Sequence, residues 1–127
     1  MGETSHSVLL VEDDDFIRQE VSEALRDEGY EVITAAHGRE ALEALQGGAR
    51  PSVVLLDLMM PVMNGWEFLK AFKKDEQFSA VPVVILSAFA DRATIIGGDA
   101  ISVLRKPVNL NSLFHVLGEQ CAKKRAD

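Results

Sequence analysis

The sequence predicts an α/β domain with a parallel sheet and helices on both of its faces. Five short runs rich in aliphatic and β-branched residues recur along the chain, and the segments between them place apolar residues at helical spacing. Strands that alternate with helices in this way are typical of a parallel sheet. The 127 residues contain no low-complexity segment or internal linker, and their number suits one domain with a substantial core. We therefore expect residues 1–127 to form a single doubly wound domain.

The predicted strands are short apolar runs, each followed by polar or turn-forming residues. They are Ser7–Val11, Tyr30–Ala36, Val53–Asp57, Pro82–Ser87 and Ala100–Leu104. The run before Asp57 contains only valine and leucine, as expected for a strand that is buried on both faces. Pro61 and the Asn64-Gly65 pair then interrupt the chain, which predicts a loop before the next helix.

The first predicted helix follows a run of four carboxylates at residues 12–15. Its apolar face comprises Ile17, Val21, Ala24 and Leu25. Asp14 or Asp15 is the expected N-cap, and Gly29 is expected to end the helix. Arg18 is expected to be a solvated residue of this helix.

Three further helices are well defined by their spacing, and one more is weakly defined. The well-defined ones are Gly38–Leu45, Gly65–Lys74 and a C-terminal helix that begins after Asn109 or Asn111. Their expected inward-facing residues are Ala41, Leu42, Leu45, Trp66, Leu69, Phe72 or Phe68, Leu110, Leu113, Phe114, Leu117 and Cys121. Ala90–Ile96 has the weakest helical pattern, and Gly97-Gly98 follows it at once, so we expect this fourth helix to be short or mobile.

Composition excludes several classes of function. The net charge of −7 gives no general cationic surface for nucleic acid, and the one basic cluster, Lys123-Lys124-Arg125, is typical of a solvated helix end. A single cysteine, Cys121, excludes an intramolecular disulfide and fits a reducing compartment. No apolar run approaches the roughly 20 residues of a membrane-spanning helix. We expect a cytoplasmic protein with no direct nucleic-acid binding and no membrane insertion.

Polar side chains follow four of the predicted strands at the point where each strand ends. Glu12 and Asp13 follow the first strand, Asp57 ends the third, Ser87 ends the fourth, and Lys106 comes just after the fifth. Because parallel strands end at one edge of the sheet, these groups are expected to converge there, where α/β proteins bind their ligands.

The expected group of side chains suits phosphoryl transfer. Three neighbouring carboxylates repel one another, and a hard divalent cation with oxygen ligands, Mg²⁺ or Mn²⁺, relieves that repulsion. Lys106 adds a second positive charge and Ser87 a hydroxyl. In such a site Asp57 is the candidate nucleophile that accepts a phosphoryl group as an acyl phosphate.

Four short motifs give the chain a resemblance to the receiver domains of two-component response regulators, the family of the chemotaxis regulators. They are Val11-Glu12-Asp13-Asp14, Asp57-Leu58-Met59-Met60-Pro61 with Asn64-Gly65, Ser87-Ala88 and Lys106-Pro107. They occur in the family's order, one at each expected strand end, and cover essentially the whole chain. The resemblance implies a flavodoxin-like sheet of five strands in the order 2-1-3-4-5.

The resemblance also implies a role for each site residue. Asp57 is the phosphoacceptor, and its donor is a phosphohistidine on a sensor histidine kinase or histidine phosphotransfer protein. The implied Mg²⁺ ligands are Asp13, Asp57, the backbone carbonyl of Met59 and, through water, Glu12. Ser87 and Lys106 contact the phosphoryl group. Such a domain is a signalling phosphoacceptor rather than an enzyme, and phosphorylation switches its protein contacts; the downstream partner is not indicated.

Two departures from the family pattern concern switching and phosphate lifetime. The family commonly has an aromatic residue three positions before the lysine, where this chain has Val103, so signalling is expected to use another element. Met59 and Phe89 occupy the positions two after the acceptor and two after the hydroxyl, which flank the path of an attacking water. Both are apolar and cannot orient that water, so slow autodephosphorylation is expected.

Three other functions compete with this hypothesis. A receiver-like docking module without phosphorylation is the main alternative, although the complete set of acidic, hydroxyl and lysine residues disfavours it. A haloacid-dehalogenase-type phosphatase needs a second aspartate two residues after the nucleophile, where this chain has Met59. A dinucleotide binder needs a G-x-G-x-x-G motif after the first strand, which is missing.

Overall fold

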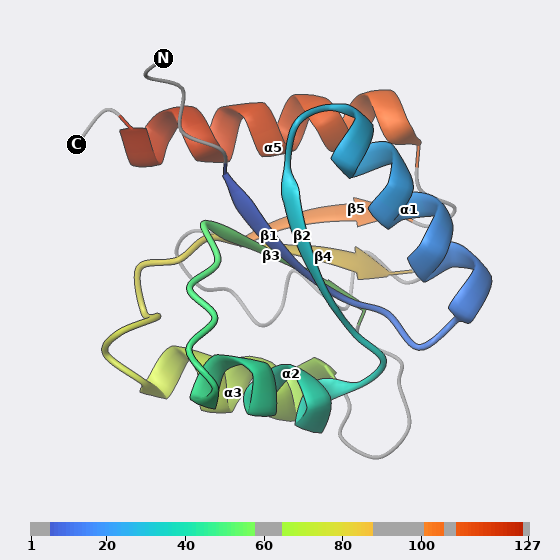
Figure 1. The fold of residues 1–127 in the computed structure, drawn as a ribbon. Coiled ribbons are helices and arrows are strands. Elements are labelled where there is room, and N and C mark those ends of the chain that lie inside the picture. The colour runs from blue at the N-terminus through green and yellow to red at the C-terminus, as the bar shows by residue number, and fades with distance from the viewer. Residues whose placement is uncertain (1–5, 58–64, 88–100, 106–108, 126–127) are drawn as a thin grey trace.

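A computed structural model describes residues 6–57, 65–87, 101–105 and 109–125 (Figure 1). Five strands form one sheet: β1 (Ser7–Val11), β2 (Glu31–Ala35), β3 (Val53–Asp57), β4 (Val83–Ser87) and β5 (Ile101–Arg105). Their order is β2-β1-β3-β4-β5, and every neighbouring pair is parallel. The predicted parallel α/β fold is confirmed, with strand ends that differ from the predicted ones by at most one residue.

Four described helices cover the two faces of this sheet (Figure 1). They are α1 (Asp15–Asp27), α2 (Gly38–Gln46), α3 (Gly65–Lys74) and α5 (Leu110–Arg125). Helices α1 and α5 lie on one face, and α2 and α3 lie on the other. The expected helix Ala90–Ile96 lies outside the described residues. Within the described part of the chain, no helix has both the length and the apolar character needed to cross a bilayer.

The central strands divide their side chains between two cores. In β1, Val8 and Leu10 pack with α1 and α5, while Leu9 and Val11 pack with α2 and α3. This alternation follows from the two-residue period of a strand. Because both faces are covered, β3 is buried along its whole length, which explains its unbroken apolar sequence before Asp57.

The core under α2 and α3 contains a stack of three phenylalanine rings. The ring centroid of Phe72 lies 5.4 Å from that of Phe68 and 5.2 Å from that of Phe78. The ammonium of Lys73 lies 5.8 Å from the ring centroid of Phe72. It donates hydrogen bonds to the backbone carbonyls of Ser79 (3.1 Å) and Val81 (2.7 Å). Burial lowers the pKa of Lys73, because desolvation disfavours its charged form.

Helix ends agree in part with the predicted caps. Asp14 caps α1, and Gly29, at φ 96°, follows its C-cap as predicted. Asn109, one of the two predicted candidates, caps α5 by accepting a hydrogen bond from the Ser112 N–H at 3.0 Å. The prediction that Leu110 faces the core is wrong: 36% of it is exposed, and burial in α5 begins one turn later. Helical periodicity gives a side chain's direction but not whether the sheet extends beneath the first turn.

The cap of α2 was not predicted. His37 is the N-cap, and its Nδ1 accepts a hydrogen bond from the Glu40 N–H at 3.2 Å. The Glu40 carboxylate in turn accepts one from the Ala36 N–H at 2.7 Å, so the two side chains hold the turn between β2 and α2.

Candidate functional site

Three carboxylates meet at the carboxyl ends of β1 and β3. Glu12, Asp13 and Asp57 each offer a carboxylate oxygen, and these oxygens all lie within 4.8 Å of one another. Glu12 and Asp57 are buried, at 0% and 3% exposure, while Asp13 is exposed. The structure therefore brings together the three acidic residues that were predicted to meet at one edge of the sheet.

The sheet register explains this meeting. β1 and β3 are neighbours, and Val11 lies opposite Leu56. Glu12, the residue after β1, consequently lies beside Asp57, the last residue of β3. Asp57 is held in place on its other side by its pairing with Leu86 of β4.

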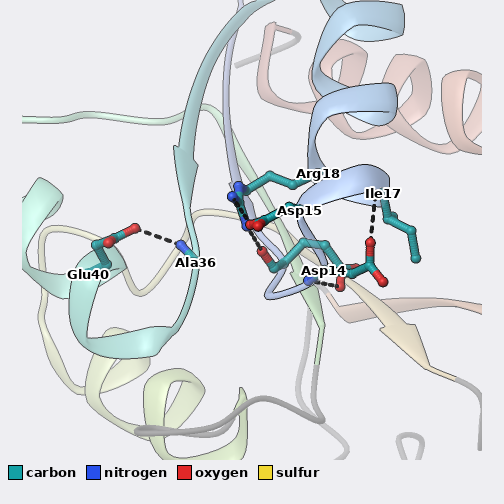
Figure 2. Close-up of polar contacts among 7 residues, drawn as sticks. Asp14, Asp15, Ile17, Arg18, Ala36 and Glu40 are labelled. Carbon is teal, nitrogen blue, oxygen red and sulfur yellow. Dashed lines mark hydrogen bonds and ion pairs between the residues drawn. The ribbon is translucent and has the colours of Figure 1, made fainter.

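The chain after β1 is held by hydrogen bonds to its backbone and side chains. The Glu12 N–H donates to the Ala35 carbonyl at 3.0 Å, which ties the end of β1 to β2. The Glu12 carboxylate turns back and accepts a hydrogen bond from the Asp14 N–H at 3.2 Å. The Asp14 carboxylate accepts one from the Ile17 N–H at 2.9 Å and so caps α1 (Figure 2). Asp13 therefore lies between Glu12 and Asp14, whose backbone N–H groups both donate hydrogen bonds.

Arg18 differs from its prediction. Only 22% of its side chain is exposed, and it reaches back from α1 to the loop instead of extending into solvent. Its Nη1 donates to the Glu12 carbonyl at 2.9 Å, and its Nη2 pairs with the Asp15 carboxylate (Figure 2). Helical spacing alone placed Arg18 on the polar side, but its partners depend on the path of the β1–α1 turn.

The remaining predicted site residues are described only in part. Ser87 is the last residue of β4 and lies opposite Arg105 of β5, so it ends at the same edge as Asp57. Its side chain is not among the described parts. Met59, Phe89 and Lys106 lie outside the described residues, as does the side chain of Val103, and their roles remain predictions.

The described donor set fits a hard divalent cation. Three carboxylates supply only oxygen ligands, which Mg²⁺ and Mn²⁺ prefer over softer metals. Two of the carboxylates are removed from water, so their mutual repulsion is screened less than it is at an open surface. A cation of charge +2 held by these carboxylates would offset that repulsion.

The family model for the response regulator receiver domain matches residues 8–118, which is most of the chain. The chain belongs to the receiver domain family. Receiver domains are signalling modules of two-component systems, and the matched residues include all three carboxylates of the acidic cluster described above.

Curated relatives and solved structures agree with this assignment. The transcriptional regulatory protein CrdR of Helicobacter pylori is 38% identical over 109 residues, covering 84% of this chain and 50% of CrdR. The response regulator Rre1 of Synechocystis sp. is 33% identical over 124 residues, covering 94% of this chain and 53% of Rre1. The chemotaxis response regulator CheY4 of Vibrio cholerae has a structure with a TM-score of 0.82 and 39% identity, covering 92% of this chain and 99% of CheY4. This receiver domain spans about half the length of the curated relatives that it matches.

Proposed function

We propose that Asp57 is the phosphoacceptor of this receiver domain and that phosphorylation requires a divalent cation, Mg²⁺ or Mn²⁺. The observation that supports this most is the meeting of Glu12, Asp13 and Asp57 within 4.8 Å at the ends of two central strands. In a receiver domain, this is the place and the chemistry expected for an aspartyl phosphate.

The roles proposed for the ligands are those that the receiver-domain family implies for these positions. Asp13 and Asp57 bind the cation directly, together with the backbone carbonyl of Met59, and Glu12 binds through water. When bound, the cation supplies positive charge that stabilises the oxygens of the transferring phosphoryl group. Ser87 and Lys106 contact the same oxygens from the ends of the fourth and fifth strands.

The transfer step is a single displacement at phosphorus. An Asp57 carboxylate oxygen forms the new P–O bond as the P–N bond to the donor histidine breaks, and the imidazole of the donor keeps the electron pair. Burial of Asp57 at 3% exposure leaves little room for competing water. We propose a sensor histidine kinase or a histidine phosphotransfer protein as the donor, and protein contacts rather than direct nucleic-acid binding as the output.

The same proposal covers the extent of the domain, its activity and the lifetime of the aspartyl phosphate. Residues 1–127 form one receiver domain, and its activity is limited to phosphoryl transfer to and from itself. The aspartyl phosphate is long-lived, because Met59 and Phe89 offer no group to orient water. Loss of the phosphoryl group within seconds would contradict the last feature.

Intact-mass spectrometry after incubation with acetyl phosphate tests the proposal. The wild type is expected to gain one phosphoryl group when Mg²⁺ is present and none when EDTA replaces it. Asp57→Asn is expected to gain none. Asp75→Asn is the matched control, because Asp75 is exposed, far along the chain in the turn after α3, and its Asn variant keeps the oxygen that accepts from the Gln77 N–H. Equal modification of Asp57→Asn and the wild type would refute the assignment, and no modification of the wild type even by a competent histidine kinase would favour the docking-module alternative.

A further inference from the structure

Arg18 makes contacts that are unusual for a residue on the solvent side of a helix. It is the only arginine in the described part of the chain that joins α1 to the loop bearing Glu12 and Asp13. Its guanidinium spans two acceptors, the Glu12 carbonyl and the Asp15 carboxylate. A planar guanidinium with several donors in fixed directions suits this bridge, which one ammonium group cannot reproduce with the same geometry.

The bridge fixes the residues on both sides of Asp13. On one side, the Glu12 backbone is held at both of its polar groups. Its N–H donates to the Ala35 carbonyl, and its carbonyl accepts from Arg18. On the other side, Asp14 is held as the helix N-cap. The Asp13 side chain is exposed, and no described packing holds it, so its direction depends on this backbone.

We infer that Arg18 is a positioning residue for the divalent cation: by holding the Glu12 carbonyl, it keeps Asp13 and Glu12 aimed at the same point as Asp57. This inference rests on the proposed cation site and goes beyond it, because Arg18 donates to the backbone and is not itself a ligand. Outer partners that orient metal ligands typically change metal affinity by about 10- to 100-fold.

The charge of Arg18 and its hydrogen bonds should have opposite effects on the affinity for the cation. A guanidinium beside an acidic cluster repels an incoming cation, so removal of the charge alone would strengthen cation binding. Removal of the bridge alone would weaken it. The sign of the change in affinity therefore distinguishes positioning from simple electrostatics.

Mg²⁺ binding to the whole chain, measured by isothermal titration calorimetry, tests the inference with three variants. Arg18→Met removes the charge and the bridge, and Arg18→Lys keeps the charge but loses the two-acceptor geometry. Arg26→Met is the matched control: it removes the same charge from the other end of α1, where the Arg26 Nη2 lies 3.4 Å from the Val32 carbonyl. Thermal unfolding of each variant in EDTA measures the structural effect separately.

Positioning predicts that Mg²⁺ binds Arg18→Met about tenfold more weakly than wild type, at the lower end of the range for outer partners. Arg18→Lys should also be weaker, and Arg26→Met unchanged. Tighter binding by Arg18→Met with wild-type affinity in Arg18→Lys would overturn the inference in favour of electrostatics. A lower melting temperature with unchanged affinity in both Arg18 variants would assign Arg18 a structural role only. If the wild type and Arg26→Met bind no Mg²⁺, the proposed cation site fails together with this inference.

Discussion

Replacement of Asp13 by asparagine should have opposite effects on stability without and with Mg²⁺. Asp13 is the exposed member of the three carboxylates whose oxygens lie within 4.8 Å of one another. The substitution removes one negative charge and keeps nearly the same shape. In the metal-free protein it relieves repulsion, whereas in Mg²⁺ it removes a proposed ligand.

The size of the relief follows from Coulomb's law. Two unit charges 4.8 Å apart repel by about 3.5 kcal/mol at an effective dielectric constant near 20 and by about 0.9 kcal/mol in bulk water. Asp13 is exposed and has two such neighbours, Glu12 and Asp57; screening by water and by salt at physiological ionic strength brings their combined repulsion to about 1 kcal/mol. We expect Asp13→Asn to raise the free energy of unfolding in EDTA by about 1 kcal/mol, or roughly 3–5 °C in melting temperature.

Mg²⁺ should instead make wild type more stable than Asp13→Asn. A ligand that binds only the folded state stabilises it by RT ln(1 + [L]/Kd), about 2.7 kcal/mol at one hundred times Kd. If Asp13→Asn binds no Mg²⁺, wild type becomes the more stable protein once Mg²⁺ exceeds roughly four to five times its Kd.

Urea unfolding followed by circular dichroism, in EDTA and across a Mg²⁺ series, measures both effects. Asp75→Asn, which removes an exposed carboxylate elsewhere, should change stability little and keep the full response to Mg²⁺. An Asp13→Asn variant that is less stable than wild type in EDTA would contradict the repulsion argument. Equal stabilisation of both proteins by Mg²⁺ would contradict the role of Asp13 as a ligand.

Three further predictions concern the fold. Phe72→Ala removes the middle ring of the buried stack and should lower the free energy of unfolding in urea by about 3–5 kcal/mol. The control Phe16→Ala, at a side chain that is 73% exposed, should change it by no more than about 0.5 kcal/mol. Equal losses in the two variants would contradict the burial of Phe72. His37→Ala should cost about 1 kcal/mol through loss of the α2 cap and His37→Asn much less, and a larger loss in the Asn variant would refute the capping role. Lys73→Met should cost about 1–2 kcal/mol through its two backbone hydrogen bonds, with Lys70→Met near zero. Burial lowers the pKa of Lys73, so the unfolded chain binds this proton more tightly than the folded protein does. The free energy of unfolding of wild type should therefore rise, relative to that of Lys73→Met, as pH rises from the folded pKa toward 10.5. A difference between the two proteins that shrinks over this range would contradict the lowered pKa.

The sequence predicted the layers of the fold well because burial on both sheet faces requires unbroken apolar strands. The run before Asp57 was identifiable for this reason, and the rule that parallel strands end at one edge then predicted the meeting of Glu12, Asp13 and Asp57. The helices α1 and α3 were likewise marked by apolar spacing and by glycine or acidic residues at their ends.

Features that depend on the path of the chain were not predicted. Histidine is not among the residues most favoured at N-caps, so nothing in the sequence pattern identified His37 as the cap of α2. Arg18 contacts a carbonyl six residues earlier, a separation that no helical repeat predicts. Leu110 matched the apolar stripe of α5 but lies before the turn at which that helix becomes buried.

The role of Asp57 is tested most directly by chemical identification of the phosphorylated residue. After phosphorylation in Mg²⁺, borohydride reduces an aspartyl phosphate to homoserine, and peptide mass spectrometry locates the change. We expect homoserine at position 57 in wild type, none in EDTA, and none at any position in Asp57→Asn. Homoserine at another aspartate of the wild type, or a phosphorylated protein that borohydride does not reduce, would contradict the account of this site.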